Sequence, residues 1–93
     1  MKYKVENVEK QTSYTDVSFT TEINGKKVLF HKALEAADMG YYSGYQLFVD
    51  DKFIGSGDYY DFGAYLETDV EPLLGMDADD LKDVIEGILW ELN

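Results

Sequence analysis

The dipeptide Asn24-Gly25 constrains the fold of this chain more than any other feature. It separates two runs, residues 17–23 and 26–31, in which apolar and polar side chains alternate with the period of a half-buried strand. A two-residue type I′ turn needs positive φ at both central positions, which Asn and Gly adopt readily. The sequence therefore predicts a β-hairpin over residues 15–31.

The same turn predicts the register of this hairpin. Counting outward from the turn, Phe19 lies opposite Phe30 and Glu22 lies opposite Lys27. Apolar pairs then share one face, and a charge pair lies on the other. We expect the apolar face to pack in the core.

Three further segments complete the expected sheet. Tyr3 and Val5 alternate with lysines, which is typical of a strand, and residues 45–56 contain two apolar runs around Asp50-Asp51. The second pattern predicts another hairpin, with Phe48 opposite Phe53. Residues 33–44 show a weaker pattern, and we expect an irregular loop there.

The end of the chain is predicted to be helical. Apolar residues recur there at helical spacing: Leu81, Val84, Ile85, Ile88, Leu89 and Leu92. Asp77 is a suitable N-cap. Residues 61–74 fit both a helix and an alternating strand, and we favour a helix distorted near Pro72.

Together these elements predict one α+β domain over residues 1–93. We expect an antiparallel sheet of four to five strands, with hairpins at 15–31 and 45–56, packed by one or two C-terminal helices. The chain has no cysteine, so thiol nucleophiles, thiolate metal sites and disulfides are excluded. No apolar run is long enough for a membrane span or a signal peptide, and we expect a cytoplasmic protein.

The charge is unevenly distributed along the chain. Residues 1–32 carry six lysines and four acids, whereas residues 33–93 carry fifteen acids and two lysines, for a net charge of −11 overall. Because nucleic-acid binding depends on cationic side chains that neutralise phosphates, direct binding of DNA or RNA is disfavoured. A basic protein surface is the partner that such a field attracts.

Sequence motifs for catalysis and for cofactors are missing. His31 is the only histidine, and the predicted register places it opposite Ser18, yet no nucleophile elbow accompanies it. The acidic segments fail the spacing of a calcium loop, and the glycines at 55, 57 and 63 lie beside acids that would repel a phosphate. We expect no catalytic residue, no metal and no cofactor, with His31 an ordinary surface histidine.

An acidic surface rich in tyrosine is the remaining chemical feature. Residues 55–69 hold four carboxylates, four aromatic rings and no cation. Tyrosine rings among Gly and Ser are common in binding loops, although several of the rings in this part of the chain are expected to cover the sheet or fill the space under loops instead. The rings in question are those of Tyr41, Tyr42, Tyr45, Tyr59, Tyr60 and Tyr65. The predicted partner-binding residues here and at 41–42 are Tyr41, Tyr42, Asp58, Tyr59, Tyr60, Asp61, Tyr65, Glu67 and Asp69.

The C-terminal helix contributes a second part of this predicted surface. Trp90 lies opposite the apolar stripe, on the side that carries Asp79, Asp83 and Glu86. An exposed Trp among carboxylates would be a binding hot spot. The alternative is that Trp90 folds back onto the chain or packs on a second element, and the sequence leaves this open.

In its acids, such as Asp58, Asp61, Glu67, Asp69, Asp79, Asp80 and Asp83, the chain resembles the small acidic inhibitors encoded by phages and mobile elements. These are anti-CRISPR proteins, antirestriction proteins and inhibitors of uracil-DNA glycosylase, many of which act as DNA mimics. The resemblance covers the charge pattern of residues 35–91. It implies a viral protein in the host cytoplasm whose target is a nucleic-acid-binding protein.

The expected function is therefore that of a non-enzymatic inhibitor. It would occupy the basic cleft of a nucleic-acid-binding protein, such as a CRISPR effector or a restriction enzyme, as a monomer or homodimer. The alternative is a regulatory or assembly module that binds a protein through its tyrosine loops, its acidity being incidental. A small enzyme that uses His31 is a third, weaker possibility.

Overall fold

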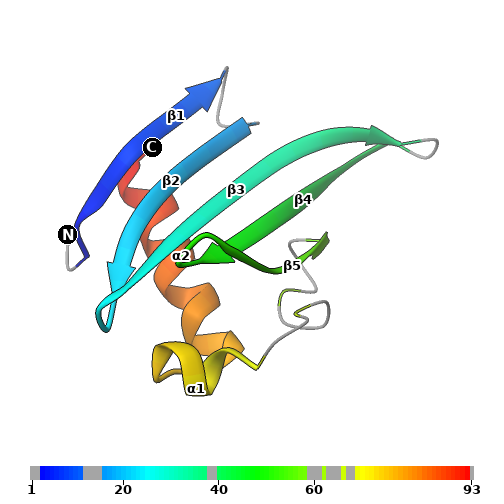
Figure 1. Ribbon diagram of the computed structural model, residues 1–93. Coiled ribbons are helices and arrows are strands. Elements are labelled where there is room, and N and C mark those ends of the chain that lie inside the picture. Colours follow the sequence, from blue (N-terminus) through cyan, green and yellow to red (C-terminus); the bar gives the residue numbers. More distant parts are fainter. Residues whose placement is uncertain are drawn as a thin grey trace.

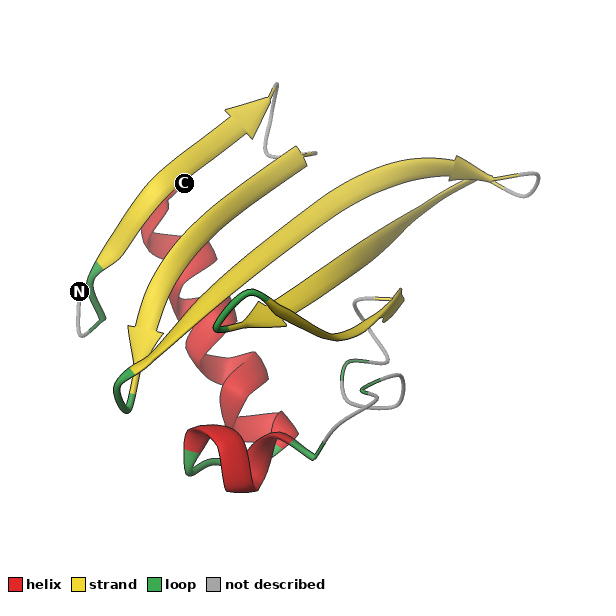
Figure 2. Cartoon of the chain, viewed as in Figure 1, coloured by secondary structure: helices red, strands yellow, loops and turns green. Residues whose placement is uncertain are grey.

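In the computed structural model the chain has an α+β fold, in which helices pack on one face of an antiparallel sheet (Figures 1 and 2). The structure describes residues 3–11, 16–37, 40–58, 62, 66 and 69–92, and for residues 11, 33–37, 40–43 and 58 it describes the backbone alone. The predicted fold class is confirmed.

The sheet is a five-stranded meander, in which each strand pairs with the next one along the chain. Its strands are β1 (Val5–Gln11), β2 (Asp16–Ile23), β3 (Lys26–Ala37), β4 (Gly40–Val49) and β5 (Lys52–Asp58). The helices α1 (Val70–Leu74) and α2 (Ala78–Leu92) follow. Figure 1 shows α2 running across one face of the sheet, with α1 near the turn between β2 and β3.

The β2–β3 hairpin has the predicted register. Phe19 pairs with Phe30 and Glu22 pairs with Lys27 across the Asn24-Gly25 turn. Both turn residues have positive φ, 50° for Asn24 and 82° for Gly25, as a type I′ turn requires.

The β4–β5 hairpin is also confirmed, with Phe48 opposite Phe53. Asp50 and Asp51 adopt φ of 49° and 66° in its turn, a conformation in which aspartate is less common than Gly. Lys27 stabilises this turn. Its backbone N–H donates to Asp50 Oδ1 over 2.9 Å, and its ammonium lies 2.7 Å from Asp51 Oδ1.

The loop predicted over residues 33–44 was wrong. β3 and β4 pair continuously to Ala37 and Gly40, so this segment is a hairpin. Among the described strands β2 pairs with β3 only as far as Ala33, and β5 pairs with β4 only as far as Gly44. The alanines and glycines of residues 33–44 have low strand propensity. The hydrogen-bonded pairing of β3 with β4 outweighs this low propensity.

The helix predicted over residues 61–74 was wrong in its first half. Leu66 forms an antiparallel bridge with Gly55, and the helix begins only at Val70. Pro72 is the third residue of α1, where a backbone N–H has no intrahelical acceptor. Proline is therefore tolerated in the first turn rather than distorting a longer helix.

The core lies between the sheet and α2. Alternate residues of β2, from Val17 to Ile23, are buried, and α2 buries Leu81, Ile85 and Ile88 against them. Asp77 caps α2 as predicted, since its Oδ1 accepts the backbone N–H of Asp80 over 2.8 Å. At the other end of α2, Lys10 Nζ donates to the carbonyl of Leu92 over 2.8 Å, which joins the helix to β1.

Candidate functional site: an acidic helical face

The outward side of α2 carries the best-defined candidate site. Asp79, Asp83, Glu86 and Trp90 follow one another at intervals of four, three and four residues, and all four are exposed. With a rise of about 1.5 Å per residue, this row extends over about 16 Å of helix. We call these four residues the acidic face.

Trp90 settles the alternative that the sequence left open. Its side chain is 79% exposed, so it does not fold back onto the chain. The cause is the helical period, since Leu81, Ile85 and Ile88 turn toward the sheet and leave the opposite side outward. Apolar surface exposed to water is unfavourable, so a partner that covered the Trp90 indole would gain free energy of binding.

Other carboxylates surround the acidic face. Residues 69–92 contain eight acids and a single lysine, Lys82, so this segment carries a net charge of −7. The exposed acids outside the acidic face are Asp69, Glu71, Asp77, Asp80 and Glu91. Glu71, Asp77, Asp80 and Glu91 were not among the binding residues expected from the sequence. Asp80 and Glu91 lie on α2, Glu71 lies on α1, and Asp77 precedes α2 as its N-cap.

Two of these carboxylates also stabilise the helices. Asp69 Oδ1 accepts the backbone N–H of Glu71 over 3.0 Å at the start of α1, and Asp77 does the same for α2. A carboxylate that caps a helix is fixed in orientation. Asp69, a predicted binding residue, is therefore exposed and held in place at the start of the acidic segment 69–92.

Three of the remaining predicted binding residues, Tyr41, Tyr42 and Asp58, lie on the sheet and not on α2. Tyr41 and Tyr42 lie on β4, opposite Ala36 and Glu35, in the part of the β3–β4 hairpin that extends past the other described strands, and Asp58 ends β5 opposite Gly44. Their backbones alone are described. Tyr59, Tyr60, Asp61, Tyr65 and Glu67 lie outside the described residues.

Tyr45 belongs to the core and not to the surface. It is 3% exposed, and its ring stacks on Phe62 with a centroid distance of 4.7 Å. It occupies the inward side of β4, where Leu47 and Val49 are also buried. This is the packing role expected for some of the tyrosines.

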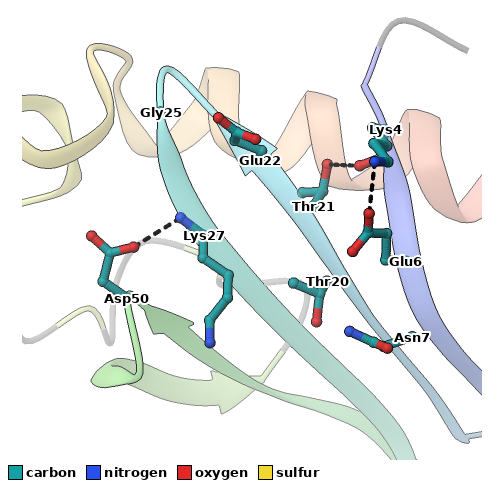
Figure 3. Close-up of a pocket in the computed structure, with 9 residues that line it drawn as sticks. All are labelled: Lys4, Glu6, Asn7, Thr20, Thr21, Glu22, Gly25, Lys27 and Asp50. Carbon is teal, nitrogen blue, oxygen red and sulfur yellow. Dashed lines mark hydrogen bonds and ion pairs between the residues drawn. The ribbon is translucent and has the colours of Figure 1, made fainter.

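A polar hollow of about 410 Å³ lies on the other side of the molecule, beside β1 and β2 (Figure 3). It was not among the sites expected from the sequence. It forms where β1 has a bulge between Glu6 and Glu9, with Asn7 at φ 54°. Val5 and Val8 are three residues apart, and this break in the two-residue period is the signal for the bulge.

Both lysines that line this hollow, Lys4 and Lys27, lie beside acids. Lys4 Nζ lies 2.9 Å from Glu6 Oε1, and the hydrogen bond and charge of Glu6 raise the pKa of Lys4 above its usual 10.5. Lys27 interacts with both aspartates of the β4–β5 turn. The hollow therefore offers hydroxyl and amide groups to small polar molecules, while Lys27 stabilises the β4–β5 turn.

His31 lies on the face of the sheet away from the helices, as the register predicted. Its Nε2 is 2.8 Å from Asp16 Oδ1, and Ser18 is its neighbour across the β2–β3 pair. These are the residue types of a nucleophilic triad, but the His31–Asp16 pair is partly exposed, and among the described residues no side-chain hydrogen bond joins Ser18 to His31. Among the described residues no group of three or more His, Asp or Glu is placed to hold a metal ion.

No protein-family model matches this chain, and no curated protein or solved structure matches it. Neither helix in the described part of the chain has the length and apolarity of a membrane span. Function is therefore inferred from the chemistry of the surface.

Proposed function

We propose that this protein is a non-enzymatic inhibitor that binds a basic nucleic-acid-binding protein through the acidic face of α2. The observation that carries the proposal is Trp90, which is 79% exposed in line with three carboxylates of one helix. The chemistry resembles that of a nucleic acid strand, in which negative groups follow one another along a rod and flat rings lie beside them. A CRISPR effector or a restriction enzyme is the kind of target that fits, in the host cytoplasm.

Electrostatics supports this choice of partner. Along the axis of α2, Asp79 and Asp83 are about 6 Å apart, and Asp83 and Glu86 are about 4.5 Å apart. Neighbouring carboxylates are therefore closer along the axis than the Debye length of about 8 Å at physiological salt. Their fields therefore add. A cleft lined by Lys and Arg is the complementary surface, and it would be drawn to the acidic face before contact.

The ring of Trp90 would supply affinity that the exposed charges do not. Exposed ion pairs contribute little affinity, since water screens them. A Trp that inserts into a pocket of the partner adds apolar burial, and Arg side chains of a basic cleft stack readily on indole. The carboxylates would then mainly set the association rate, and Trp90 the lifetime of the complex.

A charge-matched pair of variants tests this proposal. The first replaces Asp79, Asp83 and Glu86 by Asn, Asn and Gln. The control replaces Glu6, Glu9 and Glu22, which are exposed on the β1–β2 side, by Gln. Both changes raise the net charge by three, so only the position of the charge differs.

The partner would be captured from a bacterial lysate at low and at high salt, and its association rate with each variant would then be measured. We expect the acidic-face variant to associate about tenfold more slowly at low salt and with a weaker salt dependence. DNA or RNA should compete with the wild-type protein for the captured partner. Equal rates for the two variants, or binding that nucleic acid leaves unchanged, would exclude the acidic face as a nucleic-acid mimic.

The second candidate is a regulatory or assembly module whose acidity is incidental. It is favoured by the β3–β4 hairpin, which carries Tyr41 and Tyr42 past the last described pairs of β2 and β5. Binding that tolerates salt and is lost on replacing both tyrosines by Ser would support this function instead.

A further inference from the structure

The sheet has one face that the described helices do not cover, and we call it the open face (Figure 2). Strand register defines its central row, because Thr20 pairs with Leu29, Leu29 with Phe48 and Phe48 with Phe53. The residues that precede and follow each of these on β2, β3 and β4 point inward and are buried. The row therefore runs across β2, β3 and β4 on the side of the sheet that faces away from the helices.

Part of this row is apolar and accessible. Phe53 is 36% exposed, Leu29 and Phe48 are half-buried, and the rings of Phe48 and Phe53 meet edge to face at 5.5 Å. Val8, 38% exposed, lines the same shallow groove as Leu29 and Phe48 from the β1 side. An apolar centre of this kind, bordered by polar residues, is the usual composition of a protein interface.

The border of the open face has a charge pattern unlike that of the helical layer. Two of its cations lie beside acids: Lys27 is 2.7 Å from Asp51, and His31, when protonated, would pair with Asp16 at 2.8 Å. The helical layer carries eight acids against one lysine over residues 69–92. Two copies of this chain would repel each other through their helices, whereas their open faces can approach with charges of both signs.

The size of the open face suits a dimer. Five strands at about 4.8 Å, each with roughly eight residues at about 3.4 Å, give a face of about 24 by 27 Å. Two such faces packed together would bury on the order of 1,300 Å², and stable interfaces bury about 1,200–2,000 Å². Stacked sheets lie about 10 Å apart, so the two helical layers would be separated by about 30 Å, well beyond the Debye length.

We propose that the open face binds a second copy of this chain, with the Leu29–Phe48–Phe53 row at the centre of a twofold sheet-on-sheet interface. A twofold contact uses the same patch on both subunits, as a self-complementary border of lysines and acids allows. The two acidic faces then point outward on opposite sides of the dimer. This inference does not rest on the proposed function, because the acidic face of α2 takes no part in it.

Matched aromatic substitutions test the proposal. Phe53→Glu places a like charge from each copy at the centre of the interface, and Trp90→Glu makes the same chemical change on the helical layer. Molar mass would be measured by light scattering and sedimentation over a range of protein concentrations, with circular dichroism to verify folding. We expect twice the 10.6 kDa chain mass for the wild type and Trp90→Glu, and the chain mass for Phe53→Glu.

Disulfide trapping gives a second measurement that does not depend on the folding of Phe53→Glu. Because the chain has no cysteine, a single introduced thiol reports on one position. Gln46→Cys lies exposed on the open face beside Phe48, and Glu86→Cys lies on the acidic face. Oxidation should link the first variant into dimers and leave the second monomeric.

Three results would overturn the proposal. The first is a wild-type protein that stays monomeric at every concentration. The second is a dimer that persists in folded Phe53→Glu, and the third is cross-linking of Glu86→Cys that equals that of Gln46→Cys. Each would show that self-association, if present, uses another surface.

Discussion

Single residues set the turns of this molecule through their backbone conformation. Gly25 has φ 82°, and a Cβ built there would meet no atom within 4 Å. Gly87 has the same free space but lies within α2. The two glycines therefore differ in backbone conformation and not in available room.

Alanine at these two positions should have opposite effects on stability. At Gly25 the left-handed conformation costs a residue with a Cβ about 1–2 kcal/mol, so Gly25→Ala should lower the free energy of unfolding. Gly87→Ala should raise it by about 0.5–1 kcal/mol, because alanine loses less backbone entropy in a helix. Urea unfolding of both variants measures the signs. If Gly25→Ala proved as stable as the wild type, the type I′ turn would be wrong.

At the scale of elements, hydrogen bonds from the sheet and from capping residues fix the ends of the helices. The amide of Asn24, in the β2–β3 turn, donates a hydrogen bond to the carbonyl of Leu74 at the end of α1. Gly75 then ends α1 in the left-handed conformation, with φ 73°. The first hairpin turn thus helps to position the helices that carry the acids.

The N-cap of α2 gives a prediction at this scale. Asp77→Ala removes the acceptor for the backbone N–H of Asp80 and should lower the free energy of unfolding by about 1 kcal/mol. Asp77→Asn keeps an oxygen acceptor and should stay close to the wild type. Equal losses in both variants would mean that the charge of Asp77, and not its capping bond, stabilises the helix.

At the scale of the whole molecule, the two outer surfaces have different chemistry. The helical layer is almost purely acidic and exposes Trp90, while the open face of the sheet mixes lysines with acids around a small apolar row. We infer that the first binds a basic protein and the second a further copy of the chain. A dimer of this form would present two acidic faces, and a bivalent target would bind it with higher avidity.

The fluorescence of Trp90 distinguishes binding at the two surfaces, because Trp90 is the only tryptophan and lies on the acidic face and not on the open face. Its emission should be red-shifted and readily quenched by acrylamide, unaltered by self-association, and protected in the partner complex. Trp90→Ala should weaken partner binding by about 2 kcal/mol, roughly thirtyfold, with little change in stability.

Ile88→Ala, at a buried site of the same helix that is only 2% exposed, is the control for Trp90→Ala. It should lower the free energy of unfolding by about 2–5 kcal/mol, whereas Trp90→Ala should leave it nearly unchanged. Blue-shifted emission that acrylamide cannot quench would remove Trp90 from the acidic face.

The sequence by itself determined the elements whose signals are local. Asn24-Gly25 specifies a turn through its allowed φ angles, so the register of β2 and β3 follows by counting. The apolar period of α2 and the cap at Asp77 are likewise encoded within one segment. The row from Asp79 to Trp90 follows from the same period.

Only the tertiary structure decided the features that depend on contacts distant in sequence. Residues 33–37 and 40–44 are strands because they pair with each other in continuation of the sheet, not because of their own propensity. Leu66 bridges Gly55 instead of starting a helix, and Pro72 enters the first turn of α1. Whether Trp90 is exposed depends on what packs beside α2, and a helical period specifies which side faces outward but not what covers it.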